Sequence, residues 1–149
     1  MILKIGDKAP HFEGIDQNGQ TITLEQFKGK KLVLYFYPKD NTPGCTAEAC
    51  NLRDNYKTFL AQGYAVIGVS ADSIKSHLNF AQKYQLPFPL ISDPDKKILT
   101  AYQAYGEKKM YGKVVMGTIR KTYIIDENGI IQDIIEKVDT KNHSEQILK

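Results

Sequence analysis

Short apolar runs recur along the chain, and stretches with helical spacing separate them. A run that is short, apolar and rich in β-branched and aromatic residues predicts a buried strand. The tripeptide Glu127-Asn128-Gly129 is typical of a hairpin turn, and extended segments flank it on both sides. The predicted main strands are residues 31–37, 64–70, 87–92, 119–126 and 130–138.

Helical periodicity and capping residues predict four helices in the remaining segments. In the second of these, Ile74, His77, Leu78 and Ala81 are expected to form the inner stripe. The predicted helices are residues 42–61, 73–84, 93–104 and 142–149.

The pattern is weaker before the first main strand and in one later segment. Two short extended pieces, 10–15 and 21–24, surround a turn at 16–20, and residues 24–27 are expected to form one helical turn. Residues 107–117 are the least regular part of the chain.

The order of these elements indicates an α/β fold. Alternating strands and helices favour a sheet covered by helices, and the final hairpin makes that sheet mixed. This is the thioredoxin-like arrangement: a central mixed β-sheet flanked by helices, with an N-terminal β extension. We find no internal repeat, low-complexity segment or linker, so residues 1–149 are expected to form a single domain.

Composition narrows the possible partners and location. The 149 residues are 42% apolar and 25% charged, which is ordinary for a soluble globular protein. The net charge of +3 is spread without a block of five like charges, so we expect no nucleic-acid or membrane-surface binding. No apolar run approaches a signal peptide or the ~20 residues of a membrane span, so we expect a cytoplasmic protein.

Both cysteines of the chain lie just after the first main strand, too few for a disulfide-stapled scaffold. Thr42 is a plausible N-cap and Pro43 suits the first helical position, which places Cys45 in the first turn. Unpaired N–H groups and the helix dipole favour a thiolate there. Because the dipole contributes only about 0.3–1 kcal/mol, a reactive Cys45 also needs a cation.

The spacing of Cys45 and Cys50 conflicts with a disulfide on an intact helix. Five residues of helix separate the Cα atoms by about 8.6 Å, whereas a disulfide needs roughly 4.4–6.8 Å. Either the two cysteines are unrelated, or the first helical turns unravel for the bond to form. Ala47 and Ala49 are small, so little apolar area near the bond would be lost.

The cysteines also allow other interpretations. Cys45 alone could be a buried, inert thiol. The pair is not C-x-x-C, which weakens a dithiol oxidoreductase. A zinc or scaffold module is disfavoured because His11, His77 and His143 are scattered, so we expect no metal and surface or partly buried histidines.

Arginine is rare here, since Arg53 and Arg120 are the only arginines among 20 basic residues. At each of these two positions the planar guanidinium, with its several N–H donors, could therefore be required where a lysine would not suffice. For Arg53 the alternative is a helix-surface ion pair, and for Arg120 it is an edge-strand pair with an aspartate. Glu48 is expected to support the helix N-terminus or to orient an arginine.

Pro38, Thr42 and Cys45, in the spacing Pro-x-x-x-Thr-x-x-Cys, resemble the active-site signature of the peroxiredoxins, thiol peroxidases built on a thioredoxin fold. The longer string 35–54 resembles the bacterioferritin-comigratory, or peroxiredoxin Q, branch of that family. The similarity extends to residues 6–10, 68–72, 90–93 and 120–126.

The resemblance implies a role for each cysteine. Cys45 would be the peroxidatic cysteine, which attacks hydrogen peroxide or an organic hydroperoxide and becomes a sulfenic acid. Cys50 would be the resolving cysteine, forming an intramolecular disulfide that a thioredoxin-type protein reduces. Because that disulfide is internal, a monomer is expected. The alternative is a thioredoxin-like dithiol–disulfide oxidoreductase or redox sensor without peroxide turnover.

The resemblance also implies the substrate-binding residues. Pro38, Thr42, Gly44 and Arg120 would line the peroxide site. Pro38 would shield the site from water, and the Thr42 hydroxyl would bind the thiolate and the peroxide. Arg120 would supply the missing cation. No metal, haem or flavin is implied as a cofactor.

Overall fold

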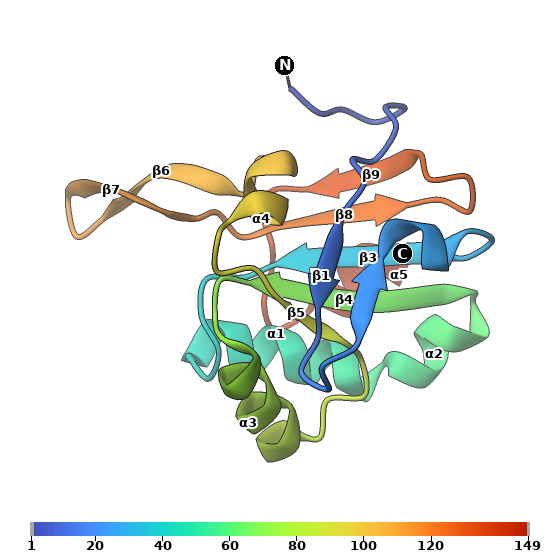
Figure 1. Cartoon of the computed structure of the whole chain (residues 1–149), viewed down its shortest axis with the longest axis horizontal. Coiled ribbons are helices and arrows are strands. Elements are labelled where there is room, and N and C mark those ends of the chain that lie inside the picture. Colours follow the sequence, from blue (N-terminus) through green and yellow to red (C-terminus); the bar gives the residue numbers. More distant parts are fainter. Residues whose placement is uncertain (1, 149) are drawn as a thin grey trace.

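The computed structural model describes residues 2–148, with every side chain except that of Met110. A seven-stranded sheet in the order β2-β1-β5-β4-β3-β8-β9 forms its centre, and β6 and β7 form a separate two-stranded sheet (Figure 1). The strands are β1 (Glu13–Ile15), β2 (Thr21–Thr23), β3 (Lys31–Phe36), β4 (Tyr64–Ser70), β5 (Leu90–Ser92), β6 (Tyr105–Met110), β7 (Lys113–Thr118), β8 (Lys121–Ile125) and β9 (Ile131–Ile135).

Strand directions confirm the predicted mixed, thioredoxin-like sheet. Strands β3, β4 and β5 pair in parallel, as expected for strands that helices connect. Strands β3 and β8, and then β8 and β9, pair antiparallel. The predicted N-terminal extension is the antiparallel β1–β2 pair, which joins the sheet beside β5.

Side chains alternate across β3, so the strand contributes to a core on each face of the sheet. Leu32, Leu34 and Phe36 pack in one core, which includes residues of α4 and is bordered by η1. Val33 and Tyr35 pack in the other core, which contains residues of α1, α2, α3 and α5. The helices are η1 (Leu24–Phe27), α1 (Pro43–Asp54), α2 (Tyr56–Ala61), α3 (Ile74–Tyr84), α4 (Lys97–Ala101) and α5 (His143–Leu148).

Two predicted helices have different bounds in the structure. The helix predicted at 42–61 is interrupted at Asn55, whose side-chain amide donates to the carbonyl of Asn51 and so competes with the helical backbone. The helix predicted at 93–104 is short because Asp93 first forms a turn. The Asp93 carboxylate then accepts the backbone N–H groups of Lys97 and Leu99 at the start of α4.

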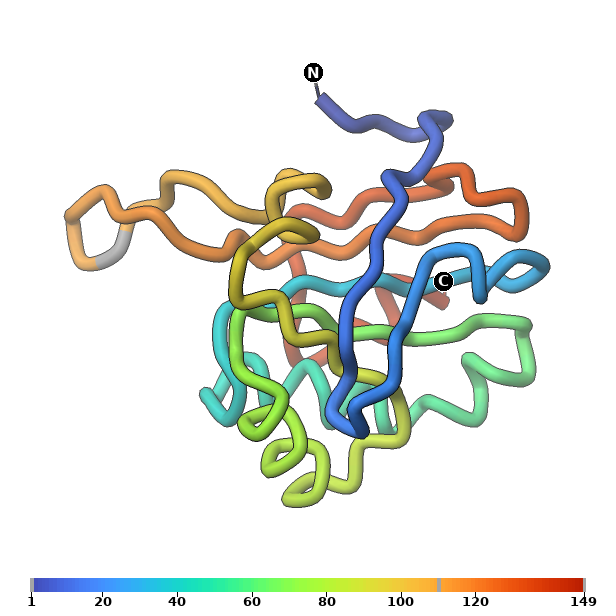
Figure 2. The backbone as a smooth tube through the Cα atoms, viewed as in Figure 1, coloured from blue at the N-terminus to red at the C-terminus, as the bar shows by residue number. Residues whose placement is uncertain are grey.

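The prediction of an irregular segment at 107–117 is wrong. The segment belongs to the β6–β7 hairpin, which projects from the body of the protein and is traced as a narrow loop in Figure 2. Tyr111 and Gly112 form its two-residue turn, both with positive φ (52° and 78°). Tyrosine is unusual at a position with positive φ, so the turn residues did not indicate a hairpin. Most of β7 is exposed, so its sequence lacks the apolar alternation of a half-buried strand.

The inner stripe of α3 also differs from the prediction. The buried residues are His77, Phe80 and Ala81, whereas Ile74 is 40% exposed. No helix among residues 2–148 is both long and apolar enough to cross a bilayer.

Candidate active site

The loop after β3 leads directly into the first turn of α1. Thr42 has the extended backbone of an N-cap, and Pro43 occupies the first helical position. Cys45 follows in that turn with only 1% of its surface exposed. The N–H groups of Gly44 and Cys45 have no partner within a helix at these positions. The sulfur therefore lies at the positive end of α1.

The Thr42 hydroxyl is held by the loop and not by the helix. Its Oγ1 donates a hydrogen bond of 2.8 Å to the carbonyl of Lys39 and makes no capping bond. The single hydroxyl proton is thus already used, and the oxygen lone pairs remain as acceptors. The hydroxyl therefore has no proton left for the expected hydrogen bond to the Cys45 thiolate.

Arg120 reaches Cys45 although 75 residues separate them in sequence. It lies between β7 and β8, and the antiparallel pairing of Lys121 with Phe36 brings it to the end of β3. Its Nη2 is 3.2 Å from Cys45 Sγ, and its Nη1 donates to Glu48 Oε1 at 2.7 Å. The planar guanidinium therefore contacts two acidic groups at once, which a lysine could not do in the same geometry.

Burial and charge set the protonation of this group. Burial raises the pKa of Glu48 to about 7, although the charge and hydrogen bond of Arg120 oppose that rise. Burial acts to lower the pKa of Arg120, but Glu48 and Cys45 outweigh it and the pKa is raised. Arg120 is therefore a permanent cation beside the sulfur.

Beside Arg120 the surface is hollowed into an open pocket of about 630 Å³. Pro38, Thr42, Gly44 and Arg120, the four residues expected to bind substrate, all line it. A Cβ at Gly44 would lie 3.3 Å from Arg120 Nη2, so a larger residue would crowd the guanidinium. The remaining wall consists of Lys39, Lys96, Tyr105, Lys108, Val115, Met116, Gly117 and Thr118.

Cys50 lies on the same continuous helix, and both thiols are free. It is partly exposed, whereas Cys45 is buried. On an intact helix their Cα atoms are about 8.6 Å apart, beyond the reach of a disulfide. Unwinding the first turns would also expose Ala49 and separate Glu48 from Arg120.

The second arginine does not join the site. Arg53 pairs with Asp54 at 2.9 Å and donates to the carbonyl of Tyr84 at 2.6 Å. This is the helix-surface ion pair considered above, with an added bond to the end of α3.

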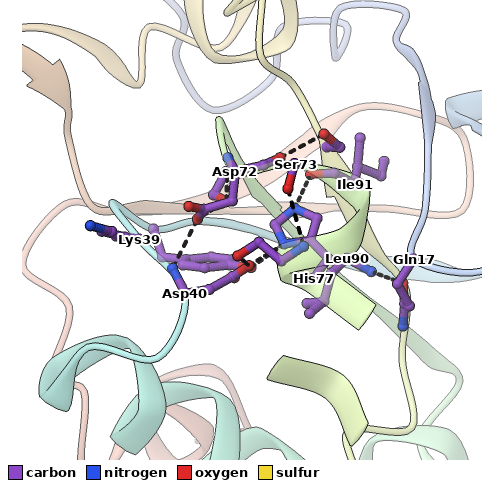
Figure 3. A network of polar contacts seen from close by, with 12 residues as sticks. Gln17, Lys39, Asp40, Asp72, Ser73, His77, Leu90 and Ile91 are labelled. Carbon is purple, nitrogen blue, oxygen red and sulfur yellow. Dashed lines mark hydrogen bonds and ion pairs between the residues drawn. The ribbon is translucent and has the colours of Figure 1, made fainter. Parts of the chain in front are cut away.

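The expectation of exposed or partly buried histidines is wrong for His77 and His143, which are fully buried. His77 Nδ1 lies 2.7 Å from Asp40 Oδ2, and the Asp40 N–H donates to Asp72 Oδ2 (Figure 3). The Tyr37 hydroxyl donates to the other oxygen of Asp40. This network ties the loop before α1 to α3, so it helps to fix the position of that loop.

Ligand atoms of Asp40, Asp72 and His77 lie within 4.8 Å of one another, which is close enough to hold a metal ion. Each of the three side chains already pairs with protein groups: Asp40 with Tyr37 and Ser76, Asp72 with Ser70, and His77 with the carbonyl of Ile91. We interpret the cluster as an anchor of the loop. The helical spacing of residues 73–84 predicts His77 on the inner face, which the structure confirms, but no sequence signal pairs His77 with Asp40.

The sequence and the fold of this chain are similar to those of known proteins. A model of the AhpC/TSA family matches residues 5–134. Peroxiredoxin Bcp of Bacillus subtilis is 43% identical over 149 residues, which covers all of this chain and 95% of that protein. Among solved structures, a variant of peroxiredoxin Q from Xylella fastidiosa has a TM-score of 0.93 and 35% identity, covering 99% of this chain and 94% of its own.

A second solved structure is the bacterioferritin comigratory protein of Xanthomonas campestris, described for its alkyl peroxide reduction activity. It has a TM-score of 0.86 and 38% identity, and the match covers 92% of this chain and 87% of that one.

Proposed function

Because this chain belongs to the AhpC/TSA family and is a peroxiredoxin, we propose that it reduces hydroperoxides through Cys45, with Cys50 as the resolving cysteine. A thioredoxin-type protein supplies the electrons. The observation that carries this proposal is the 3.2 Å contact between Arg120 Nη2 and Cys45 Sγ beside the pocket. A cation and unpaired helix amides favour the thiolate, which is the nucleophilic form of cysteine.

The first step is attack by the Cys45 thiolate on the terminal oxygen of the hydroperoxide. The O–O bond breaks, its electron pair leaves with the alkoxide or hydroxide, and Cys45 becomes a sulfenic acid. Arg120 and the N–H of Cys45 stabilise the developing negative charge. Thr42 orients the peroxide, because the lone pairs of its hydroxyl accept a hydrogen bond from the peroxide O–H. The Thr42 hydroxyl proton itself is donated to the backbone carbonyl of Lys39. Pro38 borders the pocket and shields the reaction from water.

In the second step the Cys50 thiolate attacks the sulfenic sulfur, hydroxide leaves as water after protonation, and a disulfide forms. The helix must open for this step, because Cys45 and Cys50 are too far apart on intact α1. We expect oxidation to lower amide protection across residues 43–52. Hydrogen exchange on the reduced and oxidised protein measures this, and equal protection in both states would contradict the opening.

The Cys50→Ser variant tests the complete cycle. It is expected to consume one equivalent of peroxide and then to stop with thioredoxin as the reductant, because no disulfide is available for exchange. Peroxide consumption coupled to a thioredoxin system, with mass spectrometry of the oxidised protein, measures both parts. Undiminished turnover by this variant would contradict Cys50 as the resolving residue. Disulfide exchange without peroxide consumption by the unsubstituted protein would support the oxidoreductase alternative.

The substrates we propose are hydrogen peroxide and organic hydroperoxides. The alkyl peroxide activity of the Xanthomonas campestris relative supports the second class, as do the apolar side chains of Val115 and Met116 in the pocket wall. We further propose a single-domain monomer in the cytoplasm, since an internal disulfide requires no partner subunit. No metal or organic cofactor is needed for these steps.

A further inference from the structure

Behind Arg120 lies a buried polar cluster that the reaction steps above do not use. Glu48 and His143 are both fully buried, and Glu48 Oε2 is 3.5 Å from His143 Nε2. Glu48 Oε1 accepts from Arg120, but Oε2 has no hydrogen-bond partner among the described residues. An unpartnered carboxylate oxygen in a protein interior is costly. The burial of this unpartnered Glu48 oxygen therefore needs an explanation other than a hydrogen bond within the protein.

The hydrogen bonds around Gln146 fix the tautomer of His143. Gln146 Oε1 accepts from the N–H of Asp139, and its Nε2 donates to the carbonyl of Lys137, so the amide has one orientation. The same Oε1 is 2.7 Å from His143 Nδ1. An amide oxygen only accepts, so Nδ1 carries the proton.

In the neutral ring His143 Nε2 is therefore an acceptor, and the Thr122 hydroxyl donates to it at 2.8 Å. An ionised Glu48 would direct the lone pairs of Oε2 at this nitrogen. The single lone pair of Nε2 already accepts from Thr122, so Oε2 gains no hydrogen bond from the ring. A proton on Oε2 removes the repulsion and neutralises the buried carboxylate.

The charge balance of the site also favours a protonated Glu48 while Cys45 is a thiolate. Arg120 is one partly exposed cation between two buried acidic groups, Glu48 and the Cys45 thiolate. With both ionised the cluster has a net negative charge, which burial disfavours. With Glu48 protonated the cluster is neutral. After Cys45 becomes a neutral sulfenic acid, neutrality instead requires an ionised Glu48.

We propose that Glu48 holds a proton while Cys45 is a thiolate and releases it when Cys45 is oxidised. The proposal rests on the peroxidase function proposed above. In balanced form, the thiolate, the protonated Glu48 and ROOH give the sulfenic acid, the ionised Glu48 and ROH. The departing alkoxide takes a proton from solvent, and Glu48 returns one to solvent. Glu48 acts through Arg120 and is a positioning residue.

The other titratable groups around Glu48 do not take this role. Burial is the main cause that lowers the pKa of His143, with Arg120 adding to it and the Gln146 hydrogen bond and Asp139 opposing, so the ring stays neutral. On β3, burial and then the charges of Glu48 and Cys45 raise the pKa of Tyr35 well above its ordinary value. The exchangeable proton is thus on the carboxyl.

Infrared difference spectroscopy of the full chain tests the proposal directly. In the Cys50→Ser variant, one equivalent of peroxide converts Cys45 to the sulfenic acid, and the reaction stops there because the resolving thiol is absent. At about pH 7, we expect the carbonyl band of a protonated carboxyl to disappear and a carboxylate band to appear. Labelling with ¹³C-glutamate should shift both bands, and Glu48 is the only buried glutamate of the described residues. At about pH 9 the change should vanish, because Glu48 is then ionised in both states.

Proton uptake gives a second measurement. Peroxide reduction by a thiolate takes up one proton per peroxide, and release from Glu48 should reduce this uptake near neutral pH. Glu48→Gln should restore full uptake and remove both infrared bands, while Glu145→Gln, on the exposed side of α5, should change neither.

The outcomes separate this inference from the proposed function. Peroxide consumption without a glutamate band change in the labelled protein would overturn the inference and leave the peroxidase function standing. Equal proton uptake by Glu48→Gln and the protein that retains Glu48 would overturn it as well. The labelled protein needs no substitution at Glu48, so the band assignment holds even where Glu48→Gln does not fold. Failure to form a sulfenic acid at all would overturn both proposals.

Discussion

The Cys45→Ser variant is expected to lose peroxide consumption completely. A serine hydroxyl is not ionised at neutral pH, so the contact with Arg120 no longer prepares a nucleophile. The substitution is nearly isosteric, but Cys45 is buried in the core beneath α1, so folding must be checked by circular dichroism and urea unfolding. Peroxide consumption with a thioredoxin system is the measurement.

Cys50→Ser is the matched control, because it removes the other thiol of the same helix. It should keep the first reaction with peroxide, whereas Cys45→Ser should not. Measurable turnover by folded Cys45→Ser would show that the nucleophile is elsewhere and that the assignment of the site is wrong.

The Arg120→Lys variant is expected to react with peroxide about 10²-fold more slowly, the typical effect of removing one donor to a developing oxyanion. Lysine retains the charge but lacks the fork that contacts Glu48 and Cys45 together. Single-turnover kinetics of Cys45 oxidation measure the effect without interference from the later steps.

Arg53→Lys provides the control, since Arg53 is the other arginine and lies on the same helix as Cys45. Its partners are Asp54 and the carbonyl of Tyr84, outside the pocket, so its rate of peroxide reaction should be essentially unchanged. A rate for Arg120→Lys as high as that of Arg53→Lys would remove Arg120 from the mechanism.

The central sheet could be predicted because its signals are local. The apolar runs of β3 and β4 and the turn at residues 127–129 each lie within a few residues, and the structure confirms them. The start of α1 is equally local, since Thr42 and Pro43 mark it. Helix ends were less accurate, because side-chain bonds such as that of Asn55 to Asn51 decide them.

The contacts of the site could be inferred only in part. The rarity of arginine indicates that Arg120 could have a specific role, but its position beside Cys45 depends on the pairing of β8 with β3. Glu48 is one helical turn from Cys45, so a shared face was foreseeable. Nothing near His143 in the sequence indicated that α5 would place it behind Glu48, because that contact is tertiary.

The β6–β7 hairpin has a further consequence for how this protein can change. It supplies Val115 and Met116 to the pocket, yet it forms its own sheet and contributes little to either core. We therefore expect substitutions of Val115 and Met116 to change the pocket wall with little effect on packing in either core. Mutation or directed evolution can reshape this wall for new peroxides while the nucleophile, its arginine and the folded scaffold stay intact.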